Sequence, residues 1–172
     1  MGAWAYVERD APEERVWFIE KPGLIDANIW IGDRTGPRTR IDIPSDCWAQ
    51  VSRGWLAVKP RTPWNIGGET YGADTVIGMS FPAFLAGDRR FTRLFEPGDR
   101  RALQVFFWCG GQLVLSILDD LRPVFEVFTP SDAEWAREVI TGLPDIGTAH
   151  VWPLDIYPEE SNGDLLAAAH RS

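Results

Sequence analysis

The sequence contains few residues of the kinds that build disulfide frameworks or metal sites. Cysteine and histidine occur only twice each, as Cys47, Cys109, His150 and His170. They show no metal-ligand spacing such as Cys-x2-Cys, and two isolated cysteines are typically small buried hydrophobic residues. The sequence therefore predicts neither a metal site nor a disulfide framework.

Long hydrophobic runs and an excess of basic residues are also missing. No apolar run approaches the roughly 20 residues of a membrane-spanning helix, and the first ten residues lack the basic and apolar regions of a signal peptide. The 17 Lys and Arg against 25 Asp and Glu leave a net charge of −8, without the excess of positive charge that nucleic acids attract. We expect a cytoplasmic protein with no membrane and no nucleic-acid partner.

Glycine pairs and charged pairs lie at positions where turns are expected. Gly67-Gly68 and Gly110-Gly111 follow Asn65-Ile66 and Cys109 between expected strands and open no helix. They therefore indicate hairpin turns, not phosphate loops, and no cofactor is expected. Asp119-Asp120 is interpreted as a solvated hairpin turn, in preference to a carboxylate pair for acid–base or metal chemistry. Arg89-Arg90 and Arg100-Arg101 adjoin Asp88 and Asp99, which is typical of mixed-charge turns.

Aromatic residues are abundant, with nine Trp and nine Phe, and strand signals run almost end to end. Short runs rich in β-branched and aromatic residues, bounded by Gly, Pro, Asn or Asp, predict strands. In one of them Thr39, Ile41 and Ile43 alternate with polar neighbours, as in a half-buried strand. Residues 82–87 and 131–134 are short helical turns or loops. The predicted strands are 15–20, 28–32, 38–43, 55–58, 75–79, 90–95, 103–108, 112–118 and 123–128.

A recurring tripeptide suggests how these strands are grouped. Pro44-Ser45-Asp46 precedes Trp48, and Pro130-Ser131-Asp132 precedes Trp135, 86 residues further along the chain. That distance is two repeats of about 43 residues, the size of a four-stranded propeller blade. We therefore predict an all-β fold of antiparallel four-stranded meanders over residues 1–172. It would form part of a β-propeller, about four blades of an expected seven.

Several segments resemble the propeller of bacterial prolyl oligopeptidase-like serine peptidases. The resemblance runs from about residue 5 to residue 166 and rests on structural motifs, at 15–23 with 40–44, 54–64 with 67–71, 84–91 with 94–97, and 113–122. It implies a seven-bladed propeller over an α/β-hydrolase domain that cleaves after proline with a Ser-Asp-His triad. The propeller would restrict access to short peptides. The partner would then be an α/β-hydrolase domain, which these residues lack, and the substrate a short peptide.

The catalytic signature of that family is missing. In 78–82 Ser80 has Pro82 where a Gly-X-Ser-X-Gly elbow has its second glycine, and no helix is expected to follow directly. No catalytic residue is therefore assigned, and His150 is interpreted as an ordinary strand histidine. The expected function is a propeller segment that screens peptides and docks a hydrolase domain but is inactive alone.

Among the tryptophans, Trp64 is the candidate for a substrate groove. It follows Pro63 in an expected loop, where an exposed indole could contact a peptide. Four others lie within predicted strands and are expected to pack between sheets: Trp17, Trp30, Trp55 and Trp108.

Two alternatives remain open. Gly2-Ala3-Trp4 fits the Gly-X-Trp that opens lipocalin-like barrels, which would make the chain a freestanding module for an apolar small ligand. Incomplete blades could instead expose strand edges that pair with another chain.

Overall fold

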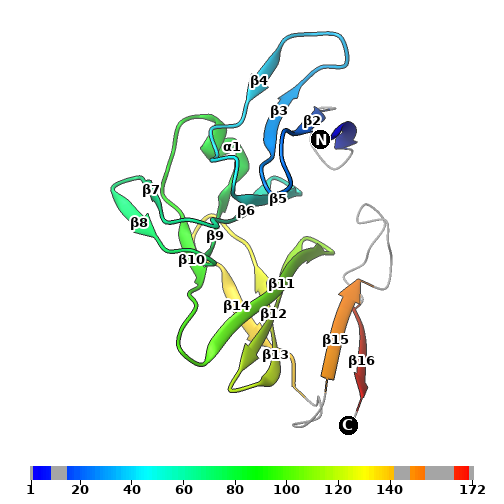
Figure 1. The fold of residues 1–172 in the computed structure, drawn as a ribbon, viewed down its shortest axis with the longest axis vertical. Helices are drawn as coiled ribbons and strands as arrows, with labels where there is room; N and C mark the ends of the chain where they lie inside the picture. Colours follow the sequence, from blue (N-terminus) through cyan, green and yellow to red (C-terminus); the bar gives the residue numbers. More distant parts are fainter. Residues whose placement is uncertain (1, 9–14, 142–147, 154–164, 171–172) are drawn as a thin grey trace. The chain divides into compact units, whose positions relative to one another are not determined.

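The computed structural model describes residues 2–8, 15–141, 148–153 and 165–170 (Figure 1). The chain divides between Arg93 and Leu94 into two compact units. The one helix of the described residues, α1 (Phe81–Leu85), is far too short to cross a membrane. The strands are Gly2–Glu8 (β1), Arg15–Lys21 (β2), Asn28–Gly32 (β3), Arg38–Arg40 (β4), Trp48–Ser52 (β5), Trp55–Lys59 (β6), Trp64–Ile66 (β7), Glu69–Tyr71 (β8), Val76–Ser80 (β9), Thr92–Phe95 (β10), Arg101–Cys109 (β11), Gln112–Asp119 (β12), Arg122–Thr129 (β13), Ala136–Val139 (β14), Thr148–Pro153 (β15) and Leu165–His170 (β16).

The first unit begins with a four-stranded antiparallel meander in the order β1-β2-β3-β4. Its two inner strands are built from the apolar runs at 16–19 and 29–31, which supply β-branched and aromatic side chains to both faces of the sheet. The register places Trp17 opposite Ile31 on one face and Phe18 opposite Trp30 on the other. The predicted strand 38–43 ends earlier than expected, at Arg40, although Ile41 and Ile43 are still buried.

A second four-stranded sheet has the order β10-β9-β6-β5, and the small hairpin β7-β8 is inserted between β6 and β9. The strands β5 and β6 are joined by a tight turn at Arg53-Gly54, where both residues have positive φ. Helix α1 follows β9 directly, with Pro82 in its first turn. Residues 82–87 therefore do contain a helical turn.

A single apolar cluster joins these elements of the first unit. Strands β2 and β3 contribute Trp17 and Ile31, β6 contributes Leu56 and Val58, and Phe81 of α1 is fully enclosed. The rings of Trp17 and Phe81 stack with centroids 5.2 Å apart. Trp17 therefore packs between sheets, as predicted.

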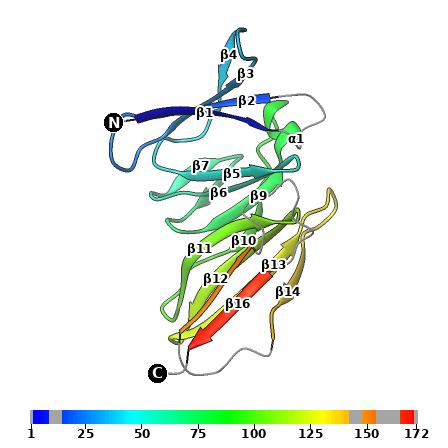
Figure 2. The ribbon, with the colours of Figure 1, turned by 90° about the vertical axis from the view of Figure 1, so that its right-hand side faces the viewer.

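The second unit contains the meander β11-β12-β13-β14 and the two-stranded sheet β15-β16 (Figure 2). Strand β12 is buried along most of its length, from Leu113 to Ile117. Trp108 of β11 is also buried and lies against Trp135, with ring centroids 6.0 Å apart. The turns at Gly110-Gly111 and Asp120-Leu121 have positive φ at both residues, which confirms hairpins at both predicted places.

The fold class is therefore confirmed as all-β with four-stranded antiparallel sheets, but the Pro-Ser-Asp repeat was not a valid guide to it. The segment at 44–46 follows the fourth strand of one sheet and leads into β5 of the next. The segment at 130–132 lies within a sheet, between its third strand β13 and its fourth strand β14. The two copies occupy different places in the fold, so their spacing is not a blade repeat.

The lipocalin-like alternative is not supported by the sheet topology. A lipocalin needs one closed barrel, whereas the strands of the described residues form separate sheets with end strands. Gly2-Ala3-Trp4 lies on β1, at the end of one of these sheets.

Candidate functional site

Trp64 lies at the start of β7, not in the loop that the sequence predicted. Strand β7 pairs with β8 around Gly67-Gly68, because two glycines with positive φ allow a two-residue turn. The indole is half-buried and packs against Phe91, with ring centroids 5.7 Å apart. The hairpin therefore holds Trp64 in place while part of the indole remains accessible.

Trp64 is one of the residues that line a hollow of about 470 Å³, which we call the Trp64 hollow. Its wall is formed by the short β7 strand and by the segment after β4, from which Ile41, Ile43 and Pro44 line the hollow. Two arginines, Arg40 and Arg89, complete the lining together with Asp42. The hollow thus combines an aromatic face with guanidinium donors.

Both arginines of the Trp64 hollow are positioned by hydrogen bonds. Arg89 donates from Nη1 to the carbonyl oxygens of Phe84 and Asp88, at 2.7 and 2.8 Å. Its Nη2 lies 3.3 Å from Oδ2 of Asp42, and Arg40 donates to Oδ1 of Asn28 at 3.1 Å. Because these contacts leave part of each fork of donors available, the hollow can bind carbonyl or carboxylate oxygens beside an indole face.

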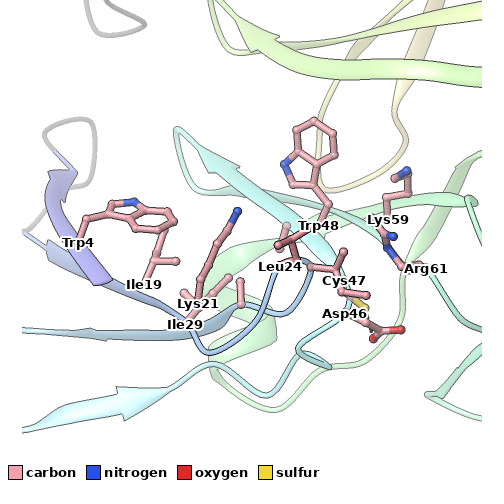
Figure 3. A pocket seen from close by; sticks show the side chains of 13 residues that line it. Trp4, Ile19, Lys21, Leu24, Ile29, Asp46, Cys47, Trp48, Lys59 and Arg61 are labelled. Carbon is pink, nitrogen blue, oxygen red and sulfur yellow. Dashed lines mark hydrogen bonds between the residues drawn. The ribbon is translucent and has the colours of Figure 1, made fainter. Parts of the chain in front are cut away.

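A second hollow of about 380 Å³ opens between β1 and β5 of the same unit (Figure 3). We call it the Trp4–Trp48 groove, after the two indoles that stand on either side of Lys21 in Figure 3. The pairing of the strands fixes the positions of the two indoles, because Trp4 on β1 lies opposite Ile19 on β2 and Trp48 on β5 lies opposite Lys59 on β6. The lining residues are Trp4, Ile19, Lys21, Leu24, Ile25, Ala27, Ile29, Asp46, Cys47, Trp48, Ala49, Lys59 and Arg61.

The thiol in this groove is not set up as a nucleophile. Burial, and to a lesser extent the neighbouring Asp46 carboxylate, raise the pKa of Cys47 to about 12. The thiolate is the reactive form, so Cys47 is protonated and unreactive near neutral pH. Cys47 and Cys109 are both buried, as the sequence predicted.

Comparison with solved structures shows that this fold occurs in a known enzyme. The chain matches the structure of a post-proline cleaving enzyme from Rickettsia typhi with a TM-score of 0.67 over 80% of its length, at 17% sequence identity. The fold is that of part of the Rickettsia enzyme. The chain spans 21% of the length of the Rickettsia enzyme chain. No protein-family model matches the sequence, and no curated protein sequence matches it.

Ser80 has a structural role in this fold. The prediction that no helix follows it is wrong, because α1 begins at the next residue. Ser80 nevertheless has extended φ and ψ of −61° and 125°, without the sharp strained turn of a nucleophile elbow. Its Oγ accepts a hydrogen bond from Ala83 N at 3.5 Å, so the side chain caps the helix.

The other predicted residues mostly lie where their sequence contexts indicated. Asp119 ends β12 and Asp120 begins the hairpin turn. The arginine pairs are mixed-charge clusters, with Arg90 2.7 Å from Asp88 and Arg100 2.7 Å from Asp120. His150 and His170 belong to β15 and β16, and their side chains lie outside the described part of the structure.

Sequence reasoning missed a buried carboxylate in the second unit. Glu126 on β13 is only 2% exposed and accepts hydrogen bonds from Arg101 at 2.5 Å and from Arg137 at 2.8 and 2.6 Å. The available signal was a lone acid within the apolar run 124–128. The Trp4–Trp48 groove was also missed, because its walls come from strands far apart in the sequence.

Proposed function

We propose that the chain is a segment of the propeller of a serine peptidase that cleaves after proline. The observation that carries this proposal is the match of 80% of the chain to the post-proline cleaving enzyme. The three four-stranded antiparallel meanders support it, since each has the form of a propeller blade. The share of only 21% of that enzyme's length agrees with a catalytic domain lying outside this sequence.

In this role the segment restricts access of substrates and docks an α/β-hydrolase domain. The Trp64 hollow is the proposed contact for a short peptide, because an indole face packs well against proline and apolar side chains. Arg40 and Arg89 beside it supply donors for peptide carbonyl oxygens. The cytoplasmic location and the absence of activity in the chain alone remain predictions.

The first experiment tests whether the chain is inert. The purified 172-residue chain is incubated with a short proline-containing peptide and with a fluorophosphonate that labels activated serines. We expect neither turnover nor labelling, since Ser80 is a helix cap. Turnover and labelling that both disappear in the Ser80→Ala variant would overturn the proposal, whereas an in-frame downstream Gly-X-Ser-X-Gly would support it.

The peptide contact is tested in the complete protein that the reading frame encodes. Trp64→Ala is expected to raise KM for a proline-containing peptide about fivefold with kcat little changed, because a stacked aromatic contact contributes about 1 kcal/mol. Trp64→Phe keeps an aromatic face and should retain most of the affinity. Equal KM values for wild-type and Trp64→Ala would show that the Trp64 hollow does not bind the peptide.

A further inference from the structure

We propose that the Trp4–Trp48 groove binds the C-terminal end of a short apolar peptide, with the peptide carboxylate facing Lys21 and Arg61. This site is separate from the Trp64 hollow. Binding there needs neither a hydrolase domain nor peptidase activity.

The aromatic walls of the groove account for the apolar part of the ligand. Trp4 is 47% exposed and Trp48 is 46% exposed, so each indole presents a large apolar surface to water. Ile19, Ile29 and Ala49 form apolar lining between them. Covering such apolar surface removes it from water, which favours binding. An apolar or aromatic side chain that covers either indole would therefore be held by contact with it.

The charges around the groove account for the carboxylate. The lining contains three cations and one acid, whereas the whole chain carries a net charge of −8. Lys59 is already paired with Asp74 at 2.9 Å, and the acid Asp46 accepts a hydrogen bond from Thr62 at 2.7 Å. The two remaining cations are the exposed Lys21 and Arg61.

Lys21 and Arg61 both line the groove and are available to an anion. Lys21 Nζ lies 5.6 Å from the centre of the Trp4 ring, which keeps the ammonium beside an apolar wall. No carboxylate is paired with Lys21 or Arg61 in the described part of the chain. An anion joined to an apolar body is therefore complementary to this groove.

The strands that carry the two indoles favour a peptide over a simple organic acid. Trp4 belongs to β1 and Trp48 to β5, and each of these strands lies at the end of its sheet. End strands offer backbone N–H and C=O groups to an extended peptide. A volume of about 380 Å³ is at the small end of ligand sites, so it suits a few residues and not a folded partner.

The test uses the full 172-residue chain labelled with ¹⁵N, in which each tryptophan gives an indole N–H signal. The Trp4 and Trp48 signals are assigned from the Trp4→Phe and Trp48→Phe variants. Titration with N-acetyl-Leu-Phe as the free acid should shift these two signals with saturation. The matched C-terminal amide should bind about tenfold more weakly, because it lacks the charge-assisted contact.

Charge variants locate the carboxylate. Lys21→Gln and Arg61→Gln should each weaken binding of the free acid and bring it towards the affinity of the amide. Arg122→Gln removes an exposed arginine of the other unit and should leave the affinity unchanged. Acid and amide binding with equal affinity, or unmoved Trp4 and Trp48 signals, would overturn the proposal.

A further ligand distinguishes the two sources of a carboxylate. Phenylacetate has the aromatic ring and the charge but no peptide backbone, so it should bind more weakly than the peptide acid. Equal affinity would show that the groove takes a free organic acid. Since the readout is binding and not hydrolysis, the proposed peptide site in the groove is tested independently of the proposed peptidase role.

Discussion

Glu126 shows how much one buried charge depends on its neighbours. Its carboxylate is almost fully enclosed. It is held by Arg101 of β11 and Arg137 of β14, the two end strands of the second unit's meander. Arg101 also lies 3.2 Å from Asp119, so the arginine bridges two acids. The hydrogen bond with Glu126 raises the pKa of Arg137, burial partly opposes it, and the charge of the carboxylate adds a smaller increase.

At the residue scale we predict that Glu126→Gln destabilises the chain. The neutral amide cannot balance two guanidinium groups, and one amide oxygen replaces two carboxylate oxygens. Since both arginines keep some contact with water, the loss in free energy of unfolding should be about 2 kcal/mol, less than for a fully buried pair. Urea unfolding at neutral pH measures it. Glu138→Gln, on the exposed strand β14, is the control and should change stability by less than about 0.5 kcal/mol.

Equal unfolding midpoints for wild-type and Glu126→Gln would show that the pairs do not contribute to stability. Sequence could not have predicted these pairs, because Arg101, Glu126 and Arg137 are separated along the chain and meet only through strand register. By contrast, the burial of Cys47 and Cys109 was predictable, because isolated cysteines are typically small buried hydrophobic residues.

At the element scale, the β7-β8 hairpin depends on its two glycines in different ways. Gly67 and Gly68 have φ of +62° and +82°, so either position strains a residue with a side chain. A Cβ at Gly67 would also overlap the carbonyl oxygen of Arg89, whereas a Cβ at Gly68 would meet open space. The two positions therefore separate backbone strain from a steric clash next to the Trp64 hollow.

Gly68→Ala should lower the free energy of unfolding by about 1 kcal/mol, the usual penalty for the left-handed region. Gly67→Ala should cost about 2 kcal/mol, because Arg89 must also shift. The shift of Arg89 should move the Trp64 indole N–H signal in the Gly67→Ala variant alone. Urea unfolding and ¹⁵N spectra of the two variants provide the comparison. Equal losses with equal Trp64 signals would contradict the predicted clash.

Strand existence was predictable from sequence, but strand ends and partners were less so. The runs at 15–20, 112–118 and 123–128 correspond closely to β2, β12 and β13. Such strands are recognisable from the local sequence, because apolar β-forming residues are bounded by turn residues. The segment 131–134 is a loop, in which Ser131 Oγ accepts a hydrogen bond from Glu134 N at 3.1 Å without starting a helix. Short strands such as β7, β8 and β14 were missed, since three or four residues carry little periodic signal.

On the scale of the whole molecule, the end strands of the sheets are the places where isolated chains could pair with one another. Strand β14 is short, exposed and carries Arg137 and Glu138, which discourages pairing with another chain. Strand β1 is seven residues long, apolar and largely exposed, and in the described residues it pairs only with β2. We therefore expect β1 to be the place where copies of the isolated chain associate.

Ala5→Lys puts a charge on the exposed part of β1 and should weaken self-association about tenfold, because a charged edge is a poor template for strand pairing. Ala136→Lys adds the same charge to β14 and should have little effect. Sedimentation velocity over a range of concentrations measures both variants. A wild-type chain that stays at 19.4 kDa at every concentration would contradict the prediction.

The sequence by itself determined the all-β class, the hairpin turns and the burial of Trp17 and Trp108, because these follow from local spacing and from the backbone preferences of neighbouring residues. Only the tertiary structure decided which tryptophans border hollows. Trp4, Trp48 and Trp64 also lie in strands, but they border the accessible surface because of where their strands lie and which segments cover them. Covering a side chain depends on contacts between distant segments, and no local pattern specifies those contacts.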